Sequence, residues 1–193
     1  MSQKFVKLAV LGSTRGTDLQ AIIDAINAGT LAASIQVVVS NKEDAYILER
    51  AKNHNLNAVF LDQNGWSRVE YDQQLSTTLK QYTPDLILLI GWMKILSREF
   101  VHEWKGKIWN VHPSLLPKHA GGMDLNVHQA VLDAGETETG CTIHEVDEGV
   151  DTGKIILQKR CAVEPTDTAD TLKAKVQKLE GEAFIEALQS FNK

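Results

Sequence analysis

Short apolar runs alternate with amphipathic stretches along the first half of the chain. The runs are rich in β-branched residues and have the length of buried strands. They are 5–11, 35–39, 58–61, 86–90 and 107–111. Between them, apolar residues recur at three- and four-residue spacing, which predicts helices near 19–26, 47–51, 75–82 and 97–104. Thr17 and Gln20 have the spacing of a capping box at the start of the first helix.

The pattern changes in the second half of the chain. Residues 112–126 form a long loop with two prolines and a Gly-Gly pair, and a short helix is expected over 127–134. Two strands, 141–146 and 154–163, are joined by too few residues for a crossover, so they are expected to form an antiparallel hairpin. A last amphipathic helix follows. The sequence therefore predicts a single α/β domain over 1–193, with a Rossmann-like, mostly parallel twisted sheet and a C-terminal antiparallel hairpin.

The composition narrows the class of protein. The 193 residues are 43% hydrophobic and 23% charged, which is typical of a globular domain. The net charge of −5 argues against a surface built to coat nucleic acid or an anionic membrane, although a local cluster of donors can still bind an anionic small molecule. No apolar run approaches the roughly 18 residues needed to span a bilayer. The N-terminus lacks a signal-peptide pattern, so we expect a cytoplasmic protein.

The two cysteines, Cys141 and Cys161, are too few for a disulfide scaffold or a four-thiolate zinc site. We expect both to be reduced. Because they lie at equal sequence distance from residue 151, a symmetric hairpin would bring them face to face.

Several residues of the second half could be metal ligands. They are His112, His119, His128, His144 and Asp124. However, the chain contains no His-x-x-x-His or Cys-x-x-Cys pair, so no metal is expected. The absence of Gly-x-Ser-x-Gly likewise argues against a serine hydrolase.

The turn after the first predicted strand, 12–18, is a candidate anion site. Ligands of open α/β sheets bind beyond the carboxyl ends of the strands, and this Gly/Ser/Thr-rich turn leads into a helix N-terminus, where N–H groups favour an anion. Arg15 adds a positive charge, whereas Asp18 opposes an anion. The turn matches neither the dinucleotide fingerprint nor a P-loop. The alternative is a tight turn in which Thr17 only caps the helix.

Two polar residues end the fifth predicted strand and point to the same face of it. The amide of Asn110 can donate to a developing oxyanion, and His112 can move a proton near neutral pH. Pro113 stops the strand. Asp151 lies in the hairpin turn, and beside His112 it would favour the imidazolium and raise its pKa. The alternative is a satisfied histidine at a strand end and an ordinary turn aspartate.

Three segments resemble the signature of the folate-dependent formyltransferases. They are Asn-x-His-Pro-Ser-Leu-Leu-Pro at 110–117, Gly-Cys-Thr-Ile-His at 140–144 and Asp-x-Gly-x-Ile-Ile-x-Gln at 151–158. The Leu-Gln-Ala-Ile-Ile-Asp segment at 19–24 and the chain length resemble the members that act in purine biosynthesis. The resemblance implies transfer of a formyl group from 10-formyltetrahydrofolate, as co-substrate, to the amine of glycinamide ribonucleotide, with no metal.

The resemblance also implies roles for the residues at matching positions. Asn110, His112 and Asp151 match the catalytic trio. The implied acceptor site comprises Arg15, Gly16, Thr17, Asp18, Leu19 and Gln20 for the phosphate and Gln177, Lys178, Leu179 and Glu180 for the ribose. The implied folate site comprises Arg68, Met93, Lys94, Ile95, Leu96, Asn110, Asp147, Glu148, Gly149, Val150 and Asp151. Residues 1–100 would thus carry the acceptor-phosphate side, and 101–193 the catalytic loop, hairpin and last helix.

The sequence departs from the family pattern in two places. The first turn differs from the more Gly- and Asn-rich version usual in the family. The segment 121–126 is longer than in some relatives, so no residue role is assigned from it.

Other functions fit parts of the same pattern. Enzymes of the same fold hydrolyse formyltetrahydrofolate, which needs no phosphate site, or formylate sugar nucleotides. The chain could instead be a nucleotide-binding module without catalysis that uses only the first turn and binds no folate. In each case the expected partners are small molecules, not nucleic acid or a membrane, and the protein is expected to be a monomer or homodimer.

Overall fold

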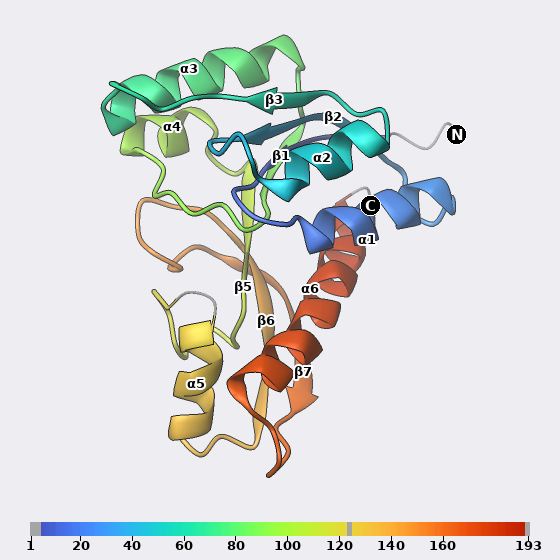
Figure 1. Ribbon diagram of the computed structural model, residues 1–193, viewed down its shortest axis with the longest axis vertical. Helices are drawn as coiled ribbons and strands as arrows, with labels where there is room; N and C mark the ends of the chain where they lie inside the picture. The colour runs from blue at the N-terminus through green and yellow to red at the C-terminus, as the bar shows by residue number, and fades with distance from the viewer. Residues whose placement is uncertain (1–4, 123–124, 192–193) are drawn as a thin grey trace.

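The computed structural model describes residues 5–122 and 125–191, which form one sheet with helices on both faces (Figure 1). The strands are β1 Val6–Leu11, β2 Ala33–Ser40, β3 Ala58–Phe60, β4 Leu86–Leu89, β5 Ile108–His112, β6 Glu138–Glu145 and β7 Ile155–Ala162. The helices are α1 Thr17–Asn27, α2 Tyr46–Asn53, α3 Arg68–Gln81, α4 Arg98–Glu103, α5 Leu125–Asp133 and α6 Ala169–Phe191. The predicted strands and helices are all present; most of their ends differ by a few residues, but α3 begins at Arg68, two turns before the predicted 75–82.

The sheet reverses its strand order at β1. The order is β3-β2-β1-β4-β5-β6-β7, and the pairs from β3 to β5 are all parallel. β6 is antiparallel to β5, and β7 is antiparallel to β6. The carboxyl ends of β1 and β4 therefore flank the switch point where open α/β sheets bind ligands. This topology confirms the predicted α/β class and the C-terminal antiparallel hairpin.

Alternate residues of β1 contribute to two separate cores, because successive side chains of a strand point to opposite faces. Leu8 lies in the core that α1, α2 and α6 cover, together with Phe184. Leu11 lies in the core that α3 and α4 cover, together with Tyr71 and Phe100. All five side chains are buried. Packing on both faces makes the sheet a rigid base for the loops at its carboxyl edge.

The start of α1 differs from the prediction. Gly16 is the N-cap residue and no side chain caps this end of the helix, so the predicted capping box of Thr17 and Gln20 is wrong. Gln20 instead accepts a hydrogen bond from Arg50 Nη1 at 2.7 Å. Gly16 has a left-handed φ of +67°, and a Cβ there would lie 2.4 Å from the Ile47 side chain. Without a side-chain cap, the backbone N–H groups of the first turn can bind a ligand.

The register of β6 and β7 separates the two cysteines. Cys141 pairs with Lys159, and Thr139 pairs with Cys161, so the prediction that the cysteines face each other is wrong. The hairpin is centred one residue earlier than a symmetric turn about residue 151 would place it. Both cysteines are free thiols.

We expect Leu75→Ala to destabilise the fold by about 2–5 kcal/mol, because the Leu75 side chain is fully buried on the inner face of α3 and its removal leaves a cavity. Urea unfolding followed by circular dichroism measures this change. The control is Gln74→Ala, an exposed position on the same helix, which should change the unfolding free energy by less than about 0.5 kcal/mol. Equal stability of the two variants would contradict the packing described here.

Candidate active site

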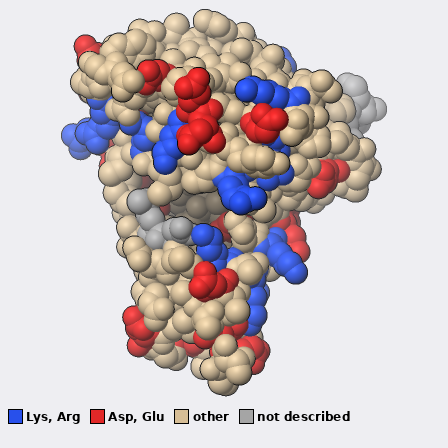
Figure 2. All heavy atoms as spheres, viewed as in Figure 1, with Lys and Arg blue, Asp and Glu red and all other residues tan. Residues whose placement is uncertain are grey.

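A cavity of about 840 Å³ lies at the carboxyl ends of β1, β4 and β5. The three segments that the sequence analysis singled out meet in its wall: the first turn, the end of β5 and the connection from β6 to β7. Figure 2 shows a hollow on the viewed face with Lys and Arg side chains around its edge. Among the lining residues, Arg15, Lys94 and Lys173 are basic, so an anionic ligand has partners there although the chain is acidic overall.

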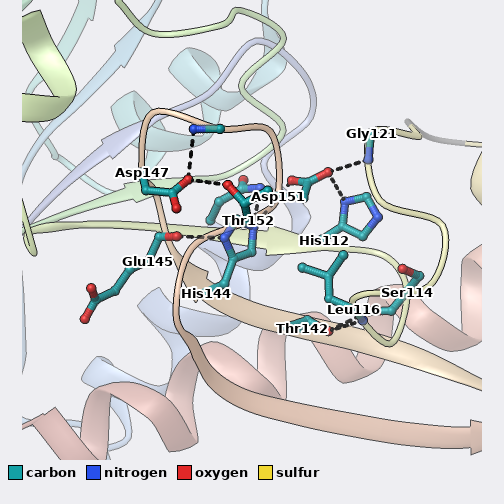
Figure 3. Close-up of polar contacts among 12 residues, drawn as sticks. His112, Ser114, Leu116, Gly121, Thr142, His144, Glu145, Asp147, Asp151 and Thr152 are labelled. Carbon is teal, nitrogen blue, oxygen red and sulfur yellow. Dashed lines mark hydrogen bonds and ion pairs between the residues drawn. The ribbon is translucent and has the colours of Figure 1, made fainter. Parts of the chain in front are cut away.

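His112 and Asp151 form a buried pair in the cavity wall (Figure 3). Nδ1 of His112 lies 3.1 Å from Oδ2 of Asp151, and the side chains are 4% and 10% exposed. Nε2 of His112 lies 3.0 Å from the carbonyl oxygen of His119. Both ring nitrogens therefore face acceptors, and either neutral tautomer leaves one nitrogen lone pair against an oxygen. Only the imidazolium makes both hydrogen bonds.

Three groups hold the Asp151 carboxylate in place, namely His112, the N–H of Gly121 and His144. Its Oδ2 accepts a hydrogen bond from the N–H of Gly121 at 2.8 Å, and its Oδ1 lies 3.5 Å from Nε2 of His144. Its φ of +56° is left-handed, a conformation that Asp and Asn tolerate better than most residues. Burial raises the pKa of Asp151, but the His144 and Gly121 contacts and the charge of His112 outweigh it and hold the pKa below its usual value. Asp151 is therefore ionised at neutral pH.

Burial dominates the electrostatics of His112. Loss of hydration disfavours the imidazolium, whereas the Asp151 carboxylate and the His119 carbonyl favour it, and the net pKa of His112 is below its ordinary value. Asp151 raises the pKa of His112 as expected, and the larger effect of burial, which the sequence analysis did not consider, sets the net direction. Burial therefore favours the neutral imidazole, and Asp151 offsets part of this effect.

Asn110 is oriented by His144, which the sequence analysis considered only as a possible metal ligand and as part of a motif. β5 and β6 pair the two residues directly. Nδ1 of His144 lies 2.8 Å from the carbonyl oxygen of Glu145, and Nε2 lies 3.2 Å from Nδ2 of Asn110 and 3.5 Å from Oδ1 of Asp151. Because an amide carries two N–H donors, the second N–H of Asn110 remains for a ligand in the cavity.

The loop after β5 is anchored to β6 and β7. The N–H of Leu116 donates to Oγ1 of Thr142, which donates to the carbonyl of Ser114 at 2.7 Å (Figure 3). Nε2 of Gln158 donates to the carbonyl of Leu116 at 3.0 Å. Hydrogen bonds thus join the Pro-Ser-Leu-Leu-Pro segment to Gln158, which is distant in the sequence. They fix the loop that brings the His119 carbonyl to the imidazole.

Only one face of α6 contributes to the cavity wall. Lys173, Gln177 and Glu180 line the cavity at the i, i+4, i+7 spacing of one helix face. The wall does not include Lys178 and Leu179, which the sequence analysis grouped with their neighbours. Lys173 is a lining residue that the sequence analysis missed, and the helical period starting from Gln177 would have found it.

In the first turn and in α3, too, only some of the predicted site residues line the cavity. Residues 15–18 line the cavity, whereas Leu19 is fully buried in the core and Gln20 is turned toward α2. Arg68 is the exposed first residue of α3 and is not among the residues that line the cavity. A contiguous stretch of a helix cannot place all of its side chains in one site. Matching a whole segment to the family therefore includes residues, such as Leu19 and Gln20, that do not line the cavity.

Arg50 and Tyr46 on α2 add to the first turn, and the sequence analysis missed both. The guanidinium carbons of Arg15 and Arg50 lie 5.7 and 5.2 Å from the centre of the Tyr46 ring. Nε of Arg50 also donates to the carbonyl of Arg15 at 3.2 Å. Two guanidinium groups thus lie beside the uncapped N-terminus of α1. No sequence spacing predicts this contact, because it depends on how α2 packs against the turn.

The opposite part of the lining is apolar and comes from the segment after β4 and the connection from β6 to β7. Met93, Ile95 and Val150 are 43%, 65% and 55% exposed and line the cavity. Large apolar side chains open to a cavity are typical of a ligand slot. In the connection, Oδ1 of Asp147 accepts hydrogen bonds from the Gly149 N–H and the Thr152 hydroxyl, which fixes the backbone beside Val150.

The histidines considered as metal ligands have other partners. Within 5–122 and 125–191, no group of three or more His, Cys, Asp or Glu side chains is placed to hold a metal ion. Asp124 lies outside the described residues. His112 and His144 face Asp151, and His119 pairs with Glu136 at 2.9 Å.

The model of a known family, described as formyl transferase, matches residues 6–188 of the chain. The chain belongs to the formyl transferase family. The phosphoribosylglycinamide formyltransferase of Haemophilus influenzae is 44% identical over 179 residues, which cover 92% of this chain and 83% of that protein. The solved structure of phosphoribosylglycinamide formyltransferase from Coxiella burnetii has a TM-score of 0.92 and 41% identity, and covers 98% of this chain and 88% of that one.

Similarity extends to a much longer protein. The trifunctional purine biosynthetic protein adenosine-3 of Drosophila melanogaster is 44% identical over 191 residues. The match covers 97% of this chain but only 14% of that protein. The formyl transferase match runs from β1 into α6, so it includes every element that lines the cavity.

We expect Asp151→Asn to lower the pKa of His112, because the substitution removes the carboxylate that favours the imidazolium. Asn accepts the left-handed φ of residue 151, so the connection should keep its shape. Histidine NMR over a pH series measures this pKa, and Asp44→Asn, at an exposed position, is the control. An unchanged His112 titration in Asp151→Asn would contradict the described pair.

Proposed function

We propose that this protein transfers the formyl group of 10-formyltetrahydrofolate to the amine of glycinamide ribonucleotide, a step of purine biosynthesis. One observation carries the proposal. A single cavity combines an anion-binding part and an apolar part with the buried His112–Asp151 pair in its wall. The relatives from Haemophilus influenzae and Coxiella burnetii are named for this reaction, which supports it.

The acceptor binds between the first turn and α6. The N–H groups at the start of α1 and the Arg15 guanidinium hold the phosphate, with Arg50 supporting the turn. Glu180 accepts hydrogen bonds from two ribose hydroxyls, because a carboxylate can accept from both members of a vicinal diol. Gln177 joins this site to the turn by donating to Oγ1 of Thr17 at 3.3 Å.

The folate binds in the apolar part of the cavity. Its pteridine is a flat aromatic ring, and Met93, Ile95 and Val150 supply apolar surface for it. Backbone groups of the connection after β6 supply hydrogen bonds to the polar edge of the ring, since Asp147 holds this backbone in one conformation. Arg68 has no place in this proposal, because it lies off the cavity wall.

In the reaction, the neutral amine of the acceptor attacks the formyl carbon. A new N–C bond forms, and the formyl oxygen gains negative charge. The free N–H of Asn110 donates to this oxygen, and so does Nε2 of His112 once it exchanges the His119 carbonyl for the substrate. The bond from the formyl carbon to the folate nitrogen then breaks. One proton leaves the attacking amine and one reaches the folate nitrogen, and His112 paired with Asp151 mediates the transfer, directly or through water.

The competing functions make different demands on the site. A formyltetrahydrofolate hydrolase does not need the basic first turn or Glu180. A nucleotide-binding module does not need a buried His–Asp pair, whose burial is costly to maintain. A sugar-nucleotide formyltransferase shares the chemistry and differs only in the acceptor, so the acceptor must be tested directly.

The remaining partners and the location of the protein are also proposals. We propose that the protein works in the cytoplasm on small molecules, as a monomer or homodimer, without nucleic acid or a metal ion. The division into an acceptor-phosphate side, 1–100, and a catalytic side, 101–193, is part of the same proposal. Within the described ranges, none of the helices has the length and apolar character needed to cross a membrane.

We expect the purified protein to formylate glycinamide ribonucleotide and not sugar-nucleotide amines, and to hydrolyse formyltetrahydrofolate only slowly when no acceptor is present. Asp151→Asn should lower kcat by at least about 100-fold, in the range typical of acid–base groups. Absorbance of the released tetrahydrofolate measures all of these rates, with Asp44→Asn as the control. Hydrolysis as fast as transfer would support a hydrolase, and a protein that binds no folate would support the binding module.

We expect Glu180→Ala to raise the KM for glycinamide ribonucleotide by roughly tenfold or more, because a hydrogen bond to a charged group contributes about 1.5–3 kcal/mol. The affinity for folate should change little, since Glu180 lies in the acceptor part of the cavity. Calorimetric titration with each ligand separates the two effects. Equal acceptor affinity of variant and parent would remove Glu180 from the acceptor site.

A further inference from the structure

An acidic residue outside the cavity wall holds the loop that contacts His112. Glu136 is on the turn between α5 and β6, and its Oε1 lies 2.9 Å from Nε2 of His119. Its Oε2 lies 2.8 Å from Nζ of Lys118. The side chains of His119 and Glu136 are only 18% and 17% exposed, whereas that of Lys118 is 62% exposed. The contact between Glu136 and His119 is therefore the better shielded of the two.

The backbone of His119 depends on its surroundings. Its φ of +56° is left-handed, which is uncommon for a residue other than glycine and persists only where neighbouring groups hold it. The hydroxyl of Ser114 donates to the carbonyl of Lys118 at 2.6 Å and fixes the preceding peptide. The carboxylate of Glu136 fixes the His119 side chain. Together these contacts set the direction of the His119 carbonyl, whose oxygen lies 3.0 Å from Nε2 of His112.

We propose that Glu136 is a positioning residue for catalysis, because it holds His119 so that the His119 carbonyl keeps a proton on Nε2 of His112. A carbonyl oxygen accepts hydrogen bonds and cannot donate them, so this contact favours the states of His112 in which Nε2 is protonated. In the proposed reaction, Nε2 donates its hydrogen bond to the formyl oxygen. The inference thus rests on the proposed function and assigns a role to a residue that does not line the cavity.

The charge state of Glu136 suits this role. Hydrogen bonding to Lys118 lowers the pKa of Glu136, burial opposes this effect, and hydrogen bonding to His119 adds to it. The net pKa is below its usual value, so the carboxylate is ionised at neutral pH and can only accept hydrogen bonds. Nε2 of His119 therefore carries a proton and donates to Glu136.

The contact of the His119 carbonyl with His112 can be followed through the pKa of His112. Burial lowers this pKa, whereas the charge of Asp151 and the hydrogen bond to the His119 carbonyl raise it. The other titratable or charged groups near His112 or in the same cavity wall are His144 on β6, the His119 side chain, His128 on α5 and Lys173 on α6. Substitution of Glu136 leaves all of these groups in the chain, so a fall in the His112 pKa reports either the lost carbonyl contact or the lost charge of Glu136.

The test compares Glu136→Ala with Glu136→Gln, because glutamine removes the charge but keeps an oxygen that accepts from His119. In Glu136→Ala, kcat should fall by about 10- to 100-fold, as is typical when a remote change misplaces a catalytic group, and the His112 pKa should fall. The KM for both substrates should stay close to that of the parent, since neither His119 nor Glu136 lines the cavity. Glu136→Gln should retain most of kcat and the parent's His112 pKa. Equal losses in the two variants would mean that only the charge matters, and would overturn the positioning role.

Glu138→Ala is the matched control. Glu138 is an exposed acid two residues further along the chain, and it pairs with Arg160 on β7. The control should leave kcat and the His112 pKa unchanged, and the other histidine signals in the same NMR spectra show whether each variant is folded. A loss as large as that in Glu136→Ala would reflect a general disturbance of β6 and would overturn the proposal.

A double-mutant cycle tests whether Glu136 acts through His119. Asparagine accepts the left-handed φ of residue 119, but its side chain is too short to reach Glu136. His119→Asn should therefore lower kcat about as much as Glu136→Ala, and the combined variant should lose no more than either one, because all three lack the same contact. Independent, multiplying losses in kcat would overturn the proposal.

The NMR titration also separates this proposal from the proposed function, because it needs no substrate. If the parent formylates glycinamide ribonucleotide and Glu136→Ala matches it in kcat and in the His112 pKa, only the assignment of Glu136 fails. If the parent does not formylate this acceptor, the proposed function fails. The His112 titrations of Glu136→Ala and Glu136→Gln then still decide whether Glu136 holds the carbonyl against the imidazole.

Discussion

The buried contact between His112 and Asp151 is the constraint on which the rest of the site depends. Leaving a buried polar group without its hydrogen-bond partner costs about 1–3 kcal/mol, a sizeable part of the roughly 5–15 kcal/mol that holds a domain folded. The surroundings must therefore satisfy both groups. The His119 carbonyl accepts from the second ring nitrogen, and the Gly121 N–H donates to the carboxylate. Loops that are distant in sequence are thereby held to one geometry by a single pair of side chains.

The sequence predicted the fold well, because the fold depends on periodicity. The apolar runs of the parallel strands and the short connection of the hairpin are local patterns, and they led to the correct sheet. The sequence could not predict which helical residues face the cavity from segment matching, as Lys178 and Leu179 show. It also could not give the net direction of the His112 pKa, because that direction depends on how deeply the ring is buried. Contacts that arise only from packing cannot be predicted from sequence spacing. Examples are the contacts of Arg50 with the first turn and of His144 with Asn110.

In the acceptor part of the cavity, a basic and an acidic side chain lie only three residues apart in the sequence. Arg15 and the uncapped start of α1 favour an anion, whereas Asp18, three residues later, is a buried acid that lines the same cavity as Glu180 of α6. A helix rotates successive side chains by about 100°, so neighbouring residues can serve different parts of one ligand. The same rotation that takes Leu19 into the core places Asp18 in the cavity wall. A phosphate and a diol can therefore be held side by side although they need partners of opposite charge.

The position of Asp151 follows from where β6 leaves the sheet. β6 is antiparallel to β5 and pairs with it only from His112 back to Trp109, after which the chain departs at Glu145. The connection then folds back over the edge of the sheet instead of continuing along β5. Gly153 makes this possible, because a Cβ there would lie 1.8 Å from the Glu145 carbonyl oxygen. The left-handed backbone of Asp151 completes the return and places its carboxylate 3.1 Å from the imidazole. Because the antiparallel β6 leaves the sheet beside Trp109, toward the amino end of β5, the connection has to turn back toward the carboxyl end before Asp151 can meet His112.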